Sequence, residues 1–77
     1  MPVTRTNQAI TLPDPSERRM IRQRARVSLQ SIADAVGCSI GSVSQWERAT
    51  TEPRSAKRAR YATELQRIAE ISELVGL

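Results

Sequence analysis

Arginine and lysine side chains dominate the chemistry that this sequence offers. The 77 residues carry 12 basic and 8 acidic side chains, for a formal net charge of +4. Residues 1–60 hold 11 of the basic and 5 of the acidic side chains, whereas residues 61–77 hold Arg67 against three glutamates. Such a basic segment suits a surface that binds a polyanion such as a nucleic acid. The alternative is an ordinary solvated surface.

Groups suited to catalysis or metal binding are scarce. The chain has no His, which excludes a Cys/His zinc site, and its single cysteine, Cys38, cannot form an internal disulfide. There is no glycine-rich phosphate loop and no acidic pair placed as a general acid and base. Cys38 itself falls at an apolar position, where a buried thiol is normally inert. We therefore expect a protein that is not an enzyme and uses no cofactor or metal.

Length and composition predict one small all-α domain. A chain of 77 residues allows a single domain with a modest core, which must come mainly from Ile, Leu, Val and Ala because there is one Trp, one Tyr and no Phe. The start lacks the apolar core of a signal peptide, and no apolar run approaches the ~20 residues of a membrane span. We expect a cytoplasmic protein without a membrane partner.

The first 13 residues are predicted to be a flexible arm, and residues 14–77 the folded domain. The arm mixes Thr, Asn, Gln and Pro, carries Arg5 as its one charge and has no helical period. It is interpreted either as a disordered tail or as an arm that reaches the DNA backbone or minor groove through Arg5.

The folded domain is predicted to be a compact bundle of four or five helices. Asp14-Pro15-Ser16-Glu17 supplies a cap, a proline at the first helical position and a capping-box glutamate. That helix is expected to run to Ala25, with Met20, Ile21 and Ala25 as its apolar stripe. Further helices are expected at 28–37, 39–48 and 55–75. The core side of the last helix is predicted to hold Tyr61, Leu65, Ile68, Ser72 and Val75.

Residues 28–48 are predicted to form two short helices joined by a tight turn. Gly37 must permit a positive φ in the turn, and Ala33 must be small because the next helix crosses close to it. Val43 and Trp46 must be apolar to pack that helix back onto its predecessor. Ala33 is followed by Gly37 after four residues, Val43 after six more and Trp46 after another three, which fits this geometry.

This stretch resembles the helix-turn-helix domains of the Cro/repressor type, also called the XRE family. The resemblance covers about residues 17–68 and is carried by Val43-Ser44-Gln45-Trp46-Glu47-Arg48 followed by Pro53, which is similar to V-S-x-W-E-x-G-x-x-x-P. It implies a phage-repressor-like (lambda-repressor-like) bundle, bacterial or phage-encoded, whose third helix enters the major groove of DNA. It also implies an ion pair between Arg22 and Glu47.

The sequence departs from the family pattern in three ways. Ala49 stands where the family usually has Gly, so either the end of the third helix differs or Ala49 is strained. Leu29 stands where a Gln often meets a phosphate, which makes Gln30 the substitute. Lys57 and Arg58 lie where an apolar residue is often found.

The resemblance places a base-reading surface on the third helix. Gln45 is the expected main reader, because its amide can make a bidentate contact to adenine worth ~1–3 kcal/mol of discrimination. Ile40 is placed to pack on a thymine methyl. The alternative is a core position, because Ile40 precedes the inward-facing Val43 by three residues, which is a helical spacing. Gly41 permits close approach of the backbone. The expected set is Ile40, Gly41, Ser42, Ser44, Gln45 and Arg48.

Phosphate contacts are expected from polar and basic side chains around this motif, assisted by N–H groups at helix starts. They are Arg5, Gln30, Ser39, Ser42, Thr50, Thr51, Arg54, Lys57 and Arg58. The arginines at positions 18, 19, 24 and 26 remain open between this role and a solvated face.

Double-stranded DNA is the expected partner, and a homodimer is expected because one reading helix makes few base contacts. The expected dimer surface lies on the last helix and contains Ile68, Ile71, Leu74 and Val75. The predicted function is a transcriptional regulator, either a repressor or Cro-like. The alternatives are an antitoxin that represses its own operon and a protein-interaction module that reuses the helix-turn-helix bundle.

Overall fold

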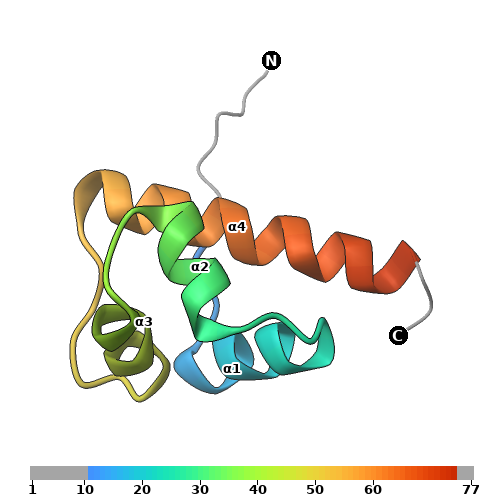
Figure 1. Cartoon of the computed structure of the whole chain (residues 1–77), viewed down its shortest axis with the longest axis horizontal. Coiled ribbons are helices and arrows are strands. Elements are labelled where there is room, and N and C mark those ends of the chain that lie inside the picture. The colour runs from blue at the N-terminus through green and yellow to red at the C-terminus, as the bar shows by residue number, and fades with distance from the viewer. Residues whose placement is uncertain (1–10, 75–77) are drawn as a thin grey trace.

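The computed structural model describes residues 11–74, which form four helices and no strand (Figure 1). The helices are α1 (Pro15–Arg24), α2 (Leu29–Val36), α3 (Ile40–Glu47) and α4 (Ser55–Leu74). The long α4 packs against α1 and α2, and α3 packs against the same two helices. The all-α prediction is therefore confirmed. The expectations for Arg5 and Val75 lie outside the described residues.

Local capping interactions explain where the first three helices begin. The carboxylate of Glu17 accepts a hydrogen bond from the Asp14 N–H at 3.4 Å, as in the predicted capping box. Ser28 caps α2 by accepting the Ser31 N–H at 3.0 Å. Ser39 caps α3 by accepting the Ser42 N–H at 3.1 Å. These side chains satisfy N–H groups that have no partner inside the helix.

Gly37 ends α2 in the left-handed conformation that the sequence predicted, with φ = +86°. Its N–H bonds the Ala33 carbonyl at 2.8 Å, which turns the chain sharply towards the next helix. Only the residues from Gly37 to Ser39 separate α2 from α3, so the two helices form the compact pair expected from the sequence.

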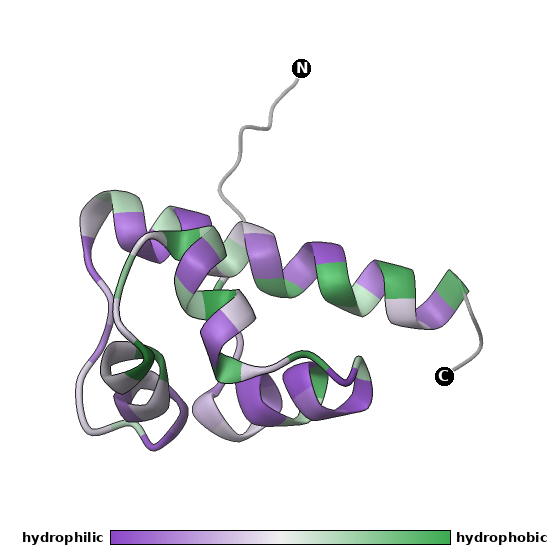
Figure 2. Cartoon of the chain, viewed as in Figure 1, coloured by the Kyte–Doolittle hydropathy of each residue, from purple (hydrophilic) through white to green (hydrophobic). Residues whose placement is uncertain are grey.

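The hydrophobic core is built mainly from α2, α3 and α4. Trp46 and Tyr61 sit at its centre with ring centroids 4.8 Å apart and a 44° angle between the rings. Figure 2 shows hydrophobic residues recurring along α4, whereas α1 is largely hydrophilic. The buried apolar residues are Leu12, Ile32, Ala33, Val36, Val43, Trp46, Tyr61, Ala62, Leu65 and Ile68.

Three expectations about burial were wrong. Leu12, assigned to the flexible arm, belongs to the core, and the next residue is tied down because the Pro13 carbonyl accepts a hydrogen bond from Arg18. Met20 is 51% exposed, because positions 18, 21, 22 and 25 share the inward face of α1 and position 20 does not. Ile68, expected also in a dimer surface, is buried in the core and is unavailable to a partner in this conformation.

Ala49 is held in the left-handed region with φ = +61°, so the strained alternative is the one observed. It stands directly after the last turn of α3. The Thr50 N–H bonds the Gln45 carbonyl at 2.9 Å, and the Ala49 N–H bonds the Trp46 carbonyl at 3.3 Å. These two bonds define a Schellman ending, whose left-handed residue is usually glycine.

The Ala49→Gly variant is expected to be more stable by about 0.5–1 kcal/mol. Glycine removes the cost of a left-handed Cβ, which is only partly offset by the greater freedom of glycine in the unfolded chain. Thermal unfolding measures the gain. The matched control is Ala59→Gly at an exposed helical position of α4, which should lose about 1 kcal/mol. Equal losses in both variants would rule out strain at Ala49.

Tyr61 is buried, and its hydroxyl has no hydrogen-bond partner among the described residues. Burial, helped by the negative charge of Glu47, raises the pKa of this phenol from 10.0 to about 12. The folded chain therefore keeps this proton to a higher pH than the unfolded chain does.

The part of the free energy of unfolding that depends on the Tyr61 proton is therefore expected to be fully present below about pH 10. It should be lost as the pH rises towards 12. The slope should approach about 1.4 kcal/mol per pH unit, because the unfolded state releases the proton first. Tyr61 is the only tyrosine, so tyrosinate absorbance reports on it alone. A titration midpoint near that of free tyrosine in the folded protein would refute the raised pKa. Tyr61→Phe should be at least as stable as the wild type and should lack this part of the alkaline loss.

Candidate nucleic-acid interface

Helix α3 is anchored on one side and open on the other. Val43, Trp46 and Glu47 are buried against the rest of the bundle. Ile40 is 43% exposed and does not pack on the core, so the alternative core position proposed for it is wrong. The other expected base-reading residues are exposed (Gly41, Gln45 and Arg48) or half-buried (Ser42 and Ser44). The structure therefore keeps this set at least partly accessible along α3 and at the residue that ends it.

The ion pair expected between Arg22 and Glu47 is present and bidentate. Arg22 donates from Nε to Oε2 at 2.5 Å and from Nη2 to Oε1 at 3.0 Å, and its Nη1 donates to the Val27 carbonyl at 3.1 Å. The hydrogen bond with Glu47 raises the pKa of Arg22 despite its partial burial. Because Glu47 is the last residue of α3, the pair locks that helix to α1.

Arg18 is a buried residue that helps to hold α3 in place, a role that the sequence analysis missed. It is only 4% exposed, so neither a phosphate contact nor a solvated face describes it. It donates to the Trp46 carbonyl at 3.0 Å and to both carboxylate oxygens of Glu52 at 3.3 and 3.0 Å. It thereby ties α1 to the end of α3 and to the following loop. The available signal was its position four residues before Arg22, on the same face of α1.

Several expected phosphate donors already have partners within the protein. Ser39 uses its hydroxyl to cap α3 and to donate to Ser42 Oγ at 3.1 Å. Gln30 donates from Nε2 to the carboxylate of Asp34 at 2.8 Å, which places a negative charge beside its amide. Thr51 donates its hydroxyl proton to Gln45 Oε1 at 3.3 Å. Thr50 is exposed.

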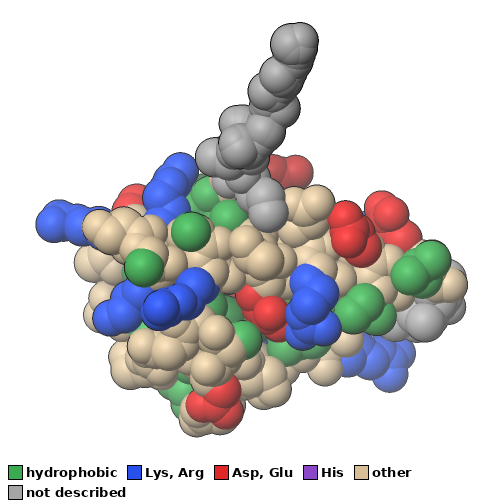
Figure 3. All heavy atoms as spheres, turned by 90° about the horizontal axis from the view of Figure 1, so that it is seen from above, with side chains coloured by type: hydrophobic (Ala, Val, Ile, Leu, Met, Phe, Trp, Pro, Cys, Tyr) green, Lys and Arg blue, Asp and Glu red, His purple; other side chains and the backbone are tan. Residues whose placement is uncertain are grey.

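Basic side chains lie around a groove between the end of α3 and the start of α4. The groove has a volume of about 490 Å³ and brings together Ser42, Arg54 and Lys57 from the predicted set. Arg60 also lines it, which the sequence analysis did not predict, while Arg58 is exposed nearby on α4. Figure 3 shows Lys and Arg side chains crowded at the end of the molecule where α4 begins. Glu52 also lines the groove, but its carboxylate pairs with Arg18, so the three basic side chains leave the groove positive overall and suited to an anionic backbone.

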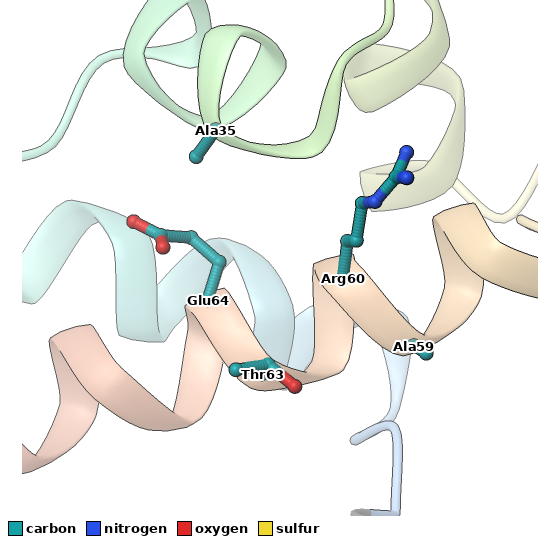
Figure 4. A pocket seen from close by; sticks show the side chains of 5 residues that line it. All are labelled: Ala35, Ala59, Arg60, Thr63 and Glu64. Atoms are coloured by element: carbon teal, nitrogen blue, oxygen red, sulfur yellow. The ribbon is translucent and has the colours of Figure 1, made fainter.

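A second hollow lies between α2 and α4 and has a different character. Its volume is about 290 Å³, and Ala35, Ala59 and Thr63 form its lining together with Arg60 and Glu64. Figure 4 shows Arg60 and Glu64 extending from α4 on the side of α2 that carries Ala35. Because its two charges are opposite, this hollow does not extend the basic surface.

Cys38 is half-buried against the core. Burial raises the pKa of its thiol, although the nearby charge of Lys57 acts in the opposite direction. The raised pKa disfavours the thiolate near neutral pH, which is the reactive form. In the part of the chain that the structure describes, no cluster of three acidic, His or Cys side chains is placed to hold a metal ion, and no helix is long and apolar enough to cross a membrane.

Comparisons of the chain with protein-family models, curated proteins and solved structures found no match.

Proposed function

We propose that this chain is a sequence-specific double-stranded DNA-binding protein of the Cro/repressor helix-turn-helix type, acting as a transcriptional regulator. The observation that carries the proposal is α3 itself. Its inner side is buried and its last residue is locked by the pair between Arg22 and Glu47, while its outer side is open beside a basic groove. A rigid, exposed helix of eight residues is about 12 Å long and fits the major groove.

Gly41 supports a close approach between α3 and a partner. A Cβ at this position would meet nothing nearer than Ser39 Oγ, at 3.8 Å, which is an ordinary contact. The fold therefore does not require glycine here, although glycine inside a helix costs about 0.5–1 kcal/mol relative to alanine. A partner that packs against the exposed backbone of α3 explains the choice.

The basic residues form two groups: those that would bind the DNA phosphates and those that would stabilise the protein fold. Arg54, Lys57 and Arg60 line the groove next to α3, where contacts to phosphates would fix the register of the helix on DNA. Arg18 and Arg22 instead have carboxylate partners inside the protein. DNA binding is thus assigned to the basic residues after α3 rather than to the inward face of α1.

A homodimer through the C-terminal part of α4 remains part of the proposal. Leu74 is 85% exposed and Ile71 is also exposed, which leaves two large apolar side chains on the same helix in water. A second copy would cover them and place two α3 helices on a palindromic site. Ile68 takes no part because it is buried.

Gln45→Ala and Arg58→Ala separate base reading from phosphate binding. Gln45→Ala is expected to weaken binding to the preferred DNA site, as selected from a random pool of duplexes, by about fivefold or more. It should leave binding to random DNA nearly unchanged, because it removes a base contact. Arg58→Ala should weaken both alike, because it removes a sequence-independent contact. Fluorescence anisotropy with both duplexes measures the two affinities. Equal losses for Gln45→Ala on the two duplexes would refute its reading role.

A further inference from the structure

The side chain of Gln45 accepts a hydrogen bond from the loop that follows α3. The Schellman ending at Ala49 turns the chain back, and the Thr50 N–H reaches the Gln45 carbonyl at 2.9 Å. This turn brings Thr51 beside the Gln45 side chain, where Thr51 Oγ1 donates to Oε1 at 3.3 Å. Both residues are exposed, so the contact lies on the surface that α3 presents.

The direction of this hydrogen bond limits what each group can offer to DNA. A threonine hydroxyl has one proton, and here it is donated to Gln45, so it is not available to a phosphate at the same time. Because Oε1 of Gln45 accepts from the loop, the amide N–H groups are the groups that Gln45 has left to offer a base. Thr51 therefore has a different role from the phosphate contact expected from the sequence.

We infer that Thr51 is a positioning residue that fixes the Gln45 amide as a hydrogen-bond donor, so that Gln45 selects guanine over adenine. Guanine presents two acceptors, N7 and O6, in the major groove, whereas adenine presents one acceptor and one donor. Bidentate reading of adenine needs the amide oxygen turned outward, which would break the hydrogen bond that Oε1 accepts from Thr51. The inference rests on the proposed function and replaces the adenine contact expected from the sequence.

The test is selection of bound duplexes from a random pool by the wild type, Thr51→Val and Thr51→Ser. Valine keeps the shape of threonine but cannot donate, whereas serine keeps the donor. The wild type and Thr51→Ser should enrich guanine at one position of each half-site. In Thr51→Val the ratio of guanine to adenine there should fall by about 2–10-fold, which corresponds to the loss of one hydrogen bond.

Gln45→Ala supplies the control that separates positioning from a general effect. In that background Thr51→Val should change base preference no further, because the oriented amide is gone. A preference for guanine that survives Thr51→Val, or a wild-type preference for adenine, would overturn the role of Thr51 while leaving DNA binding intact. No enriched site with the wild type would overturn the proposed function and this inference together. Thermal unfolding of each variant verifies that the fold is retained.

Discussion

Replacing Glu47 by Gln is expected to lower the free energy of unfolding by about 3–5 kcal/mol. The Glu47 side chain is 5% exposed and accepts two hydrogen bonds from Arg22, with Arg19 3.8 Å away. The amide keeps the shape of the carboxylate but removes its charge, which leaves the guanidinium of Arg22 partly buried without a counterion. A loss of this size is a large part of the stability of a small domain.

Chemical denaturation of paired variants isolates this effect. Glu70→Gln changes an exposed glutamate of α4 in the same way and should alter stability by less than about 0.5 kcal/mol. Joint replacement of Arg22 by Met and Glu47 by Leu should recover most of the loss, because two apolar residues leave no uncompensated charge. If Glu47→Gln and Glu70→Gln had the same free energy of unfolding, the ion pair between Arg22 and Glu47 would not be what holds α3 in place.

Arg18→Met is expected to destabilise the fold by about 2–4 kcal/mol. Methionine preserves most of the apolar stem but leaves the Pro13 carbonyl without its donor, removes the side-chain donor of the buried Trp46 carbonyl, and leaves the half-exposed Glu52 without its counterion. Each buried acceptor left unpaired costs about 1–3 kcal/mol. The loop that carries Glu52 leads into the basic groove beside α3, so DNA affinity should fall as well.

Arg19→Met is the matched control, because Arg19 is the next residue of α1 and its side chain is half exposed. It should change the free energy of unfolding by less than about 0.5 kcal/mol. Equilibrium denaturation of the two variants gives the comparison. Similar losses at the two positions would mean that the charge of α1, rather than the buried contacts of Arg18, sets the stability.

The sequence predicted what local chemistry controls. Ser28 and Ser39 mark the starts of α2 and α3 because a hydroxyl before a helix caps its free N–H groups. Gly37 marks the turn because few other residues adopt a positive φ without strain. The unusual alanine at position 49 predicted either a different helix ending or a strained residue, and the structure contains the strained residue. Local patterns thus gave the boundaries of the helix pair.

Features that depend on distant contacts could not be predicted. Arg18 shares the face of α1 that carries Arg22, but its burial also depends on Glu52, 34 residues away, which the spacing within α1 does not reveal. Arg60 lines the groove because α4 passes the end of α3, which helix spacing within α4 does not reveal. The bond between Thr51 and Gln45 likewise depends on the path of the loop. Such contacts require the three-dimensional arrangement.

The proposal that α3 and the adjoining basic groove face duplex DNA is tested most directly by the salt dependence of binding. Affinity for a labelled random duplex should be measured by anisotropy at several salt concentrations. Each phosphate contact should contribute about −0.9 to the slope of log affinity against log salt. Contacts from Arg54, Lys57, Arg58 and Arg60 together predict a slope of about −3 to −4. A flat response, or no binding at low salt, would contradict DNA binding and favour a module that binds another protein.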